Sequence, residues 1–328
     1  MNSFGTLFKV TLYGESHQDA IGIVIDGVKP GLKINWEDVE LDLAKRRPGA
    51  VGTTPRVEKD KLEVTSGMFN EYTTGSPLHI VIRNENVISK DYSHLKSQPR
   101  PGHADFVAGI KYQGFHDYRG GGRFSGRLTA PLVVAGSIAK QMLPFEFSHE
   151  LIQVGSLTDM SQLDAYLREV HNQGESVGGI VEVRVKNMVV GLGEPMFEKL
   201  DAKIGQMMFS IPAVKGVEIG TGFSGANLYG SLFNDVYEDE TGKTLTNHSG
   251  GVSGGISNGN DLIVKVFVKP TSSIGKVQSS FNLESKQKQS FEIGGRHDTA
   301  IVRRVGIVLE NALAICLADL YLWSKIYK

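Results

Sequence analysis

Two histidines and a glycine-rich loop are the residues of this sequence whose types and spacing could do chemistry. His17 ends the segment 14–17, and His103 lies within the segment 100–105. A short way along, residues 117–127 contain three consecutive glycines with arginines on both sides. Consecutive glycines expose backbone N–H groups and let a ligand approach closely, and arginines add forked donors of fixed charge. Because histidine exchanges a proton near neutral pH, this combination predicts chemistry on a phosphate or carboxylate ester.

Each of these features also has an ordinary structural explanation. A histidine where a strand ends, such as His17, commonly has a structural role. His103 precedes a predicted helix start at which Asp105 would be the N-cap. Arg46 and Arg47 end another predicted helix, where cations interact favourably with the helix dipole, but they could equally clamp an anion. Taken singly, none of these residues decides between the two interpretations.

Two later segments could also hold an anion. Residues 269–273 follow a predicted strand and offer an ammonium group and three hydroxyls, although a simple turn could have the same composition. Residues 294–298 place an arginine, a histidine and an aspartate directly after two glycines. Glycine makes up 39 of the 328 residues, and its clusters are more than tight turns alone require.

The overall composition excludes several classes of protein. The 35 basic and 36 acidic residues balance, which argues against binding to nucleic acid or to a membrane surface. Cys316 is the single cysteine, which excludes an intrachain disulfide and a multi-cysteine metal site; we expect no metal and a reducing compartment. The N-terminus shows no signal-peptide pattern. The apolar stretch 305–323 contains three polar residues, which predicts a buried helix and not a membrane span. We therefore expect a cytoplasmic protein whose basic residues serve a small anionic ligand.

Hydrophobic patterning predicts a mixture of strands and helices. The predicted strands are rich in β-branched residues and occupy 8–13, 21–25, 62–65, 78–82, 177–190 and 262–268. The predicted helices occupy 35–47 (N-cap Asn35), 129–142, 161–174 (N-cap Ser161), 195–208 (first turn at Pro195) and 301–325. Strands and helices do not alternate regularly, so we do not expect a doubly wound parallel sheet. The pattern indicates one α+β domain that spans residues 1–328.

Taken together and in this order, the motifs resemble those of the chorismate synthase family. The resemblance runs from about residue 4 to about residue 322. The matching segments are 14–17, 46–49, 66–67, 73–75, 100–105, 111–112, 117–123, 191–195, 213–220, 250–259, 269–273 and 295–298. Such a series of motifs in one order is highly specific.

The resemblance implies a fold, a reaction and a cofactor. Members of the family form a β-α-β sandwich in which central helices lie between antiparallel sheets, usually as a homotetramer. They convert 5-enolpyruvylshikimate 3-phosphate to chorismate by an anti-1,4 elimination of phosphate, as carbon–oxygen lyases of the shikimate pathway. They need reduced FMN although nothing is oxidised overall. The sequence shows no flavin reductase segment and so resembles the monofunctional type, to which a separate NADPH-dependent flavin reductase supplies the reduced flavin.

The resemblance also assigns site residues by their positions in these motifs. His17, His103 and Asp298 match the family's catalytic residues. His17 would face the leaving phosphate, His103 would protonate or polarise the reduced flavin, and Asp298 would relay a proton. The positions that match substrate-binding arginines are Arg46, Arg47, Arg100 and Arg127. The positions that match flavin-binding residues are Arg123, Phe124, Ser125, Ala213, Gly254, Lys269, Pro270, Thr271, Ser272, Ser273 and Arg296.

The chain departs from the family pattern at a few positions. These are Gln18, Phe124, Gly126, Leu128 and Pro212, together with an arginine that is missing around Gly52. The departures leave open an alternative function, namely a flavin- or phosphate-binding paralogue without the elimination activity. Retention of both histidines and of the aspartate favours the enzyme. A nucleic-acid-binding role of the glycine–arginine loop is disfavoured by the net charge and by the few aromatic residues near it.

Overall fold

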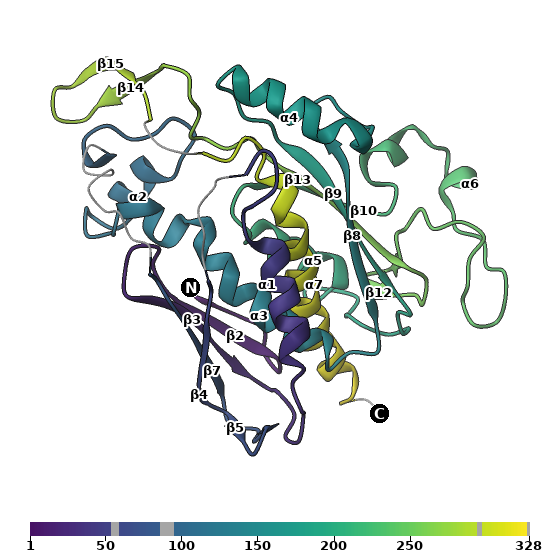
Figure 1. Cartoon of the computed structure of the whole chain (residues 1–328). Helices are drawn as coiled ribbons and strands as arrows, with labels where there is room; N and C mark the ends of the chain where they lie inside the picture. The colour runs from purple at the N-terminus through teal and green to yellow at the C-terminus, as the bar shows by residue number, and fades with distance from the viewer. Residues whose placement is uncertain (54–58, 86–94, 294–296, 327–328) are drawn as a thin grey trace.

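Two antiparallel sheets enclose a layer of helices (Figure 1). The structure is a computed structural model that describes residues 1–53, 59–85, 95–293 and 297–326. Each sheet turns a hydrophobic face toward the helices, so that one continuous core fills the space between the sheets. This arrangement confirms the predicted α+β class and the β-α-β sandwich with central helices.

The first sheet contains five strands in the spatial order β1-β2-β3-β7-β4, and every pair is antiparallel. Their bounds are β1 (Ser3–Phe4), β2 (Lys9–Gly14), β3 (Ala20–Asp26), β7 (Leu78–Arg83) and β4 (Leu62–Ser66). Ile23 and Ile80 are fully buried, because alternate side chains of a strand point to one face. Gly14 is the last residue of β2, so the end of this strand places the following His17.

The second sheet contains four strands in the order β10-β13-β9-β8, again antiparallel. Their bounds are β10 (Val214–Ile219), β13 (Leu262–Val268), β9 (Gly179–Lys186) and β8 (Glu146–Val154). Along β13 every second side chain from Leu262 to Val268 is buried. Residues 269–273 follow directly at the C-terminal end of this strand.

Four helices lie between the sheets: α1 (Trp36–Arg46), α3 (Thr129–Lys140), α5 (Leu200–Phe209) and α7 (Val302–Ser324). α3 and α7 pack along each other, and α3 is buried on almost all sides. α7 is long and apolar enough to cross a membrane, but 89% of its most apolar window is buried inside the protein, as expected for a core helix. Cys316 lies in α7, and burial raises the pKa of its thiol to about 12.

A buried polar cluster ties three of these helices to β8. Lys140 Nζ lies 2.9 Å from Asp42 Oδ2 and also contacts Glu310. His149 Nδ1 lies 2.5 Å from Glu310 Oε2, and Asn311 Nδ2 donates to Asp42 Oδ2 at 3.1 Å. Burial raises the pKa of Glu310, but the hydrogen bond with His149 and the charge of Lys140 outweigh it and lower the pKa to about 2. The cluster therefore fixes α1, α3 and α7 relative to one another.

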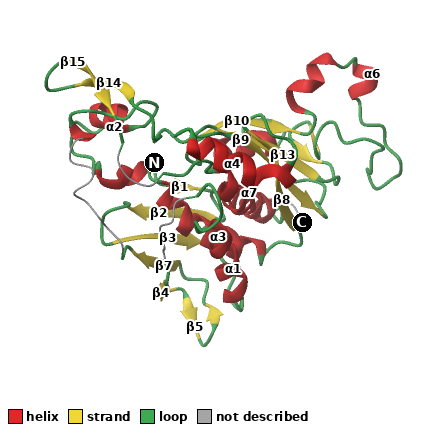
Figure 2. Ribbon diagram, turned by 45° about the horizontal axis from the view of Figure 1, so that its top comes forward, coloured by secondary structure: helices red, strands yellow, loops and turns green. Residues whose placement is uncertain are grey.

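The remaining elements lie outside these three layers (Figure 2). The outer helices are α2 (Asp105–Lys111), α4 (Leu163–Asn172) and α6 (Gly230–Phe233), with short 3-10 segments η2 (Arg119–Phe124), η3 (Gly126–Leu128), η4 (Met160–Gln162) and η5 (Gly222–Asn227). The small hairpins are β5 (Met68–Phe69) with β6 (Tyr72–Thr73), β11 (Val252–Ser253) with β12 (Ile256–Ser257), and β14 (Gln278–Asn282) with β15 (Gln287–Phe291). The β14–β15 hairpin supports the segment that leads to His103, because Leu283 N donates to Ser97 O at 2.8 Å.

Two predicted helix starts are wrong. Asp159, and not Ser161, provides the cap, since its carboxylate accepts from Ser161 N at 3.1 Å, and α4 begins only at residue 163. The helix predicted from Pro195 begins at residue 200, because Phe197 adopts a φ of +57°, which a right-handed helix cannot include. β8 and β10 were not predicted, since polar residues or a glycine interrupt their hydrophobic pattern.

Candidate active site

A cavity of about 530 Å³ opens at the N-terminal ends of α3 and α7. Many of the predicted site residues line it: Arg46, Arg100, His103, Phe124, Ser125, Arg127, Ala213, Lys269, Pro270, Thr271, Ser272, Ser273 and Asp298. These residues come from segments that are far apart in the sequence. The fold therefore brings them together around one space.

The triple glycine lies against the rings of both histidines. Gly120, Gly121 and Gly122 have φ values of +57°, +80° and +50°, which residues with a Cβ rarely adopt. A Cβ on Gly120 would lie 2.3 Å from His17 Cδ2, and a Cβ on Gly121 would lie 3.6 Å from His103 Nε2. Glycine is required at Gly120, because any larger residue would displace the imidazole of His17.

His103 is oriented by two charged neighbours. Its Nδ1 lies 2.6 Å from Asp105 Oδ1 and 3.0 Å from Arg100 Nη2. Arg100 also donates to both carboxylate oxygens of Asp105, at 2.7 and 2.8 Å. Burial raises the pKa of Asp105, but the hydrogen bonds from Arg100 and His103 outweigh it and hold that pKa far below its usual range. Nδ1 cannot both donate to Asp105 and accept from Arg100, and the shorter contact with the carboxylate favours a proton on Nδ1. Nε2 then lies on the side of Gly121 as the nitrogen that can exchange a proton.

Asp105 is not the N-cap that the sequence predicts. Ala104 occupies that position, and no side chain caps the helix there. The carboxylate of Asp105 is instead engaged by Arg100 and by the ring of His103. A charged partner competes successfully with the backbone N–H groups of a short helix.

His17 lies behind the glycine loop and is only 7% exposed. The cavity lining includes Gly120, against which the ring packs, but not His17 itself. Ser16 N donates to Gly122 O at 3.2 Å, and the side chain of Gln18 donates to Asp117 Oδ2 at 3.0 Å. The departure from the family pattern at Gln18 thus adds a hydrogen bond between the end of β2 and the loop.

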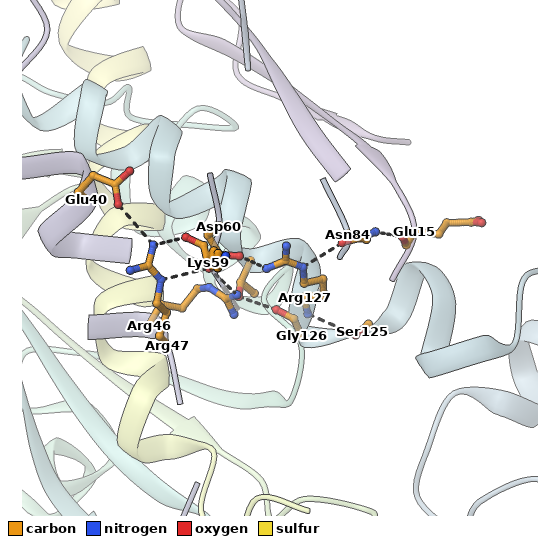
Figure 3. Close-up of polar contacts among 11 residues, drawn as sticks. Glu15, Glu40, Arg46, Arg47, Lys59, Asp60, Asn84, Ser125, Gly126 and Arg127 are labelled. Carbon is orange, nitrogen blue, oxygen red and sulfur yellow. Dashed lines mark hydrogen bonds and ion pairs between the residues drawn. The ribbon is translucent and has the colours of Figure 1, made fainter. Parts of the chain in front are cut away.

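A buried arginine cluster forms another wall (Figure 3). Arg127 Nη1 forms an ion pair with Asp60, and Arg46 Nη2 lies 3.7 Å from Asp60 Oδ2. Arg47 Nε lies 3.6 Å from the same oxygen, and Arg127 Nε donates to Asn84 Oδ1 at 3.1 Å. The side chain of Asp60 is completely buried, and those of Arg46 and Arg127 are 4% and 5% exposed.

The loop after β13 forms the opposite wall. Lys269 Nζ donates to Gly102 O at 3.0 Å and to Ser272 Oγ at 2.8 Å, so the loop is tied to the segment that carries His103. Burial lowers the pKa of Lys269, and the charge of Lys215 lowers it further. Thr271 Oγ1 is buried and has no hydrogen-bond partner among the residues that the structure describes. This wall offers an ammonium group and a hydroxyl that a ligand can engage.

Asp298 lies in the segment just before α7, beside a further arginine. Its Oδ2 lies 2.5 Å from Arg304 Nη2, and both residues line the cavity. Within the described ranges the lining holds six cationic side chains and one carboxylate, that of Asp298; the cations are Arg46, Arg100, Arg127, Lys215, Lys269 and Arg304. Even with Asp60 and Asp105 behind the lining, the cavity is therefore electropositive, although the whole chain is close to neutral.

Besides His17, four predicted site residues lie outside the cavity lining or outside the described residues. Arg47 faces Glu40 and the backbone of Lys59 as well as Asp60. Arg123 donates to Gly14 O at 3.2 Å and to Leu12 O at 2.8 Å, so it holds the end of β2. Gly254 lies in the turn between β11 and β12 and is not part of this lining. Arg296 lies outside the described residues.

Sequence reasoning missed Asp60, Lys215 and Arg304. Asp60 follows a lysine in a polar segment, and no local pattern indicates that it is buried among arginines. Arg304 lies in the first turn of α7, just before the apolar stretch, and an arginine six residues after Asp298 was an available signal. In the described part of the chain no group of histidine, cysteine, aspartate and glutamate residues is arranged to hold a metal ion.

Comparison with known proteins identifies one family throughout. The model of the chorismate synthase family matches residues 8–322. Chorismate synthase of Chitinophaga pinensis is 50% identical, over 99% of this chain and 98% of its own length. Chorismate synthase of Dehalococcoides mccartyi is 44% identical over the same shares of the two chains.

A solved structure agrees with these sequence matches. A crystal structure of chorismate synthase superimposes with a TM-score of 0.75 and 26% identity, covering 98% of this chain and 93% of the other. The family match, the relatives and the fold extend over nearly the whole length, and they do not favour a paralogue of different function. This chain belongs to the chorismate synthase family.

Proposed function

We propose that the cavity at the N-terminal ends of α3 and α7 is the site at which this chain converts 5-enolpyruvylshikimate 3-phosphate to chorismate. The reaction is an anti-1,4 elimination of phosphate, and the enzyme is a carbon–oxygen lyase acting on a phosphate. The observation that carries this assignment is the balance of six cations against one carboxylate around the cavity. The substrate carries one phosphate and two carboxylates, which such a lining would bind by charge-assisted hydrogen bonds.

The roles proposed here are those that the family resemblance implies, and the positions of the groups support them. Arg46, Arg100 and Arg127 bind anionic groups of the substrate and stabilise the charge that develops on the departing phosphate. His17, behind Gly120, donates a proton toward the leaving phosphate. His103 exchanges a proton through Nε2, since Asp105 holds its other ring nitrogen.

The residues of the opposite wall fit reduced FMN. Lys269, Ser272 and the buried hydroxyl of Thr271 can receive a phosphate, and Phe124, 37% exposed at the cavity, offers an aromatic surface. Reduced flavin would supply electron density transiently, which eases the loss of a ring proton that is not acidic. Asp298 lines the same cavity beside Arg304, and the family resemblance gives it the role of relaying a proton.

The proposal extends to the surroundings of the reaction. A separate NADPH-dependent flavin reductase supplies the reduced flavin, and the protein is a cytoplasmic homotetramer that requires neither metal nor nucleic acid. The family resemblance supports the separate reductase and the tetramer, and the composition of the sequence supports the other properties.

Phosphate release tests the proposal. Under anaerobic conditions with dithionite-reduced FMN, the protein should release phosphate from 5-enolpyruvylshikimate 3-phosphate and form chorismate. With oxidised FMN it should do neither. Binding of flavin and substrate without phosphate release would instead identify a binding paralogue, the alternative that the changes at Phe124 and Gly126 first suggested.

A further inference from the structure

Asp60 is a fully buried carboxylate outside the catalytic groups proposed above. Its side chain is 0% exposed, and its backbone φ is +49°, in the left-handed region. Among the described residues it is not part of the cavity lining. It lies directly behind two residues that are, Arg46 and Arg127 (Figure 3).

The cluster around Asp60 is unequal in charge. Three guanidinium groups, those of Arg46, Arg47 and Arg127, face one carboxylate. Arg47 also pairs with Glu40 on the exposed side. Arg46 and Arg127, by contrast, are buried beside Asp60 and line the cavity, where their positive charge suits an anion such as a phosphate monoester. Without the carboxylate, the guanidinium groups would repel one another strongly, because burial reduces solvent screening.

Arg127 has a second, neutral support. Its Nε donates to Asn84 Oδ1 at 3.1 Å, while the Asn84 amide donates to Glu15 O at 3.1 Å and to Gln18 O at 2.8 Å. This chain of hydrogen bonds fixes Arg127 to the segment that carries His17. The arginine is thereby held at both ends of its guanidinium group.

We propose that Asp60, assisted by Asn84, is a positioning residue that holds Arg46 and Arg127 in the geometry in which they receive an anionic group of the substrate. The inference rests on the proposed function for the identity of the substrate, but not for the existence of the anion site. Preorganised donors act on developing charge without the cost of rearrangement. Asp60 supplies this preorganisation from behind and never touches the ligand.

Coulomb's law and positioning predict opposite results for Asp60→Asn. The substitution preserves the volume and removes a negative charge behind an anion site, so charge alone would strengthen anion binding. If Asp60 positions the arginines, anion binding should weaken. The sign of the change therefore separates the two roles.

The experiment is calorimetric titration of the full-length protein with inorganic phosphate and, separately, with 5-enolpyruvylshikimate 3-phosphate. Asp60→Asn should weaken both by about tenfold or more, and KM should rise. Glu40→Gln is the matched control, because Glu40 contacts Arg47 at 3.3 Å from the exposed side and should leave both titrations unchanged. Asp60→Glu, which restores the charge, should recover part of the affinity.

Several outcomes would overturn the proposal. One is a folded Asp60→Asn protein that binds phosphate as tightly as the parent or more tightly. If Asp60→Asn does not fold, Asn84→Ala carries the test; it removes no charge and should weaken phosphate binding several-fold, and unchanged binding would refute the positioning role. If the parent protein bound neither phosphate nor 5-enolpyruvylshikimate 3-phosphate, there would be no anion site at these arginines. A parent protein that binds phosphate but forms no chorismate would refute only the proposed function.

Discussion

His103 has a defined orientation before any ligand arrives, because Asp105 and Arg100 both hold its Nδ1 side. His103→Ala should reduce turnover about 10²-fold or more, the usual contribution of a general acid–base group. The far-ultraviolet circular dichroism spectrum should be unchanged, since the ring is partly exposed at a cavity and not part of the core. If the folded variant turned over at nearly the rate of the parent, His103 would have a structural role and no catalytic one.

The glycine loop gives a prediction with an internal control. Gly120→Ala should abolish most activity, because its Cβ would lie 2.3 Å from His17 Cδ2 at a φ of +57°. Gly126→Ala, six residues on in the same loop, should be tolerated, because a Cβ there would meet no atom within 4 Å. Steady-state kinetics of the two variants would check this, and equal losses would show that His17 does not depend on the backbone at Gly120.

The arginine fork can be tested separately from its charge. Arg127→Lys retains the charge but loses the paired donors, so binding of substrate should weaken by about 1–3 kcal/mol, the scale of a hydrogen bond to a charged group. Arg168, exposed on α4, should tolerate the same change. If calorimetry found that Arg127→Lys and Arg168→Lys both bind substrate as tightly as the parent, Arg127 would not be an anion ligand.

At the scale of single elements, the cluster around Glu310 links stability to pH. The pKa of Glu310 is lowered to about 2 in the folded protein, below its ordinary value of 4.5. The carboxylate therefore stabilises the fold fully above about pH 4.5, and this contribution is lost as the pH falls toward 2. Glu310→Gln should lower the free energy of unfolding at pH 7 by about 2–4 kcal/mol, because it leaves His149 without its acidic partner and Lys140 with Asp42 alone.

Denaturation at several pH values would check this prediction. The difference between the parent and Glu310→Gln should shrink as the pH is lowered from 5 toward 3. The exposed Glu240→Gln serves as control and should show no such difference. A difference that stayed constant with pH would mean that the charge of Glu310 does not stabilise the helices.

The sequence predicts those elements best that have a clear periodicity or cap. The β13 strand agrees with its prediction residue for residue, and Asn35 caps α1 as expected through a bond from Glu37 N at 3.1 Å. β8 was not predicted, because Ser148, His149 and Glu150 interrupt its hydrophobic pattern. The start of α5 was missed because a left-handed φ at Phe197 depends on the surrounding turn and not on local propensity.

At the scale of the whole molecule, the motifs predict which residues line the cavity, but they do not predict the ion-pair partners that hold those residues in place. Arg46, His103, Arg127 and Asp298 line one cavity, although more than 250 residues separate the first from the last. Asp60 could not be predicted, because a buried ion pair between distant segments leaves no periodic trace in the sequence. Arg304 was overlooked although it follows its partner Asp298 by only six residues. The sandwich itself follows from the family resemblance more than from the strand pattern.

The flavin balance during turnover shows whether the protein eliminates phosphate with reduced FMN and without consuming it. The protein, dithionite-reduced FMN and 5-enolpyruvylshikimate 3-phosphate are mixed without oxygen, and chorismate, phosphate and the flavin absorbance are followed together. We expect equal amounts of chorismate and phosphate over many turnovers, with the flavin still reduced at the end. Absence of phosphate release, or oxidation of one flavin for each chorismate formed, would contradict this expectation.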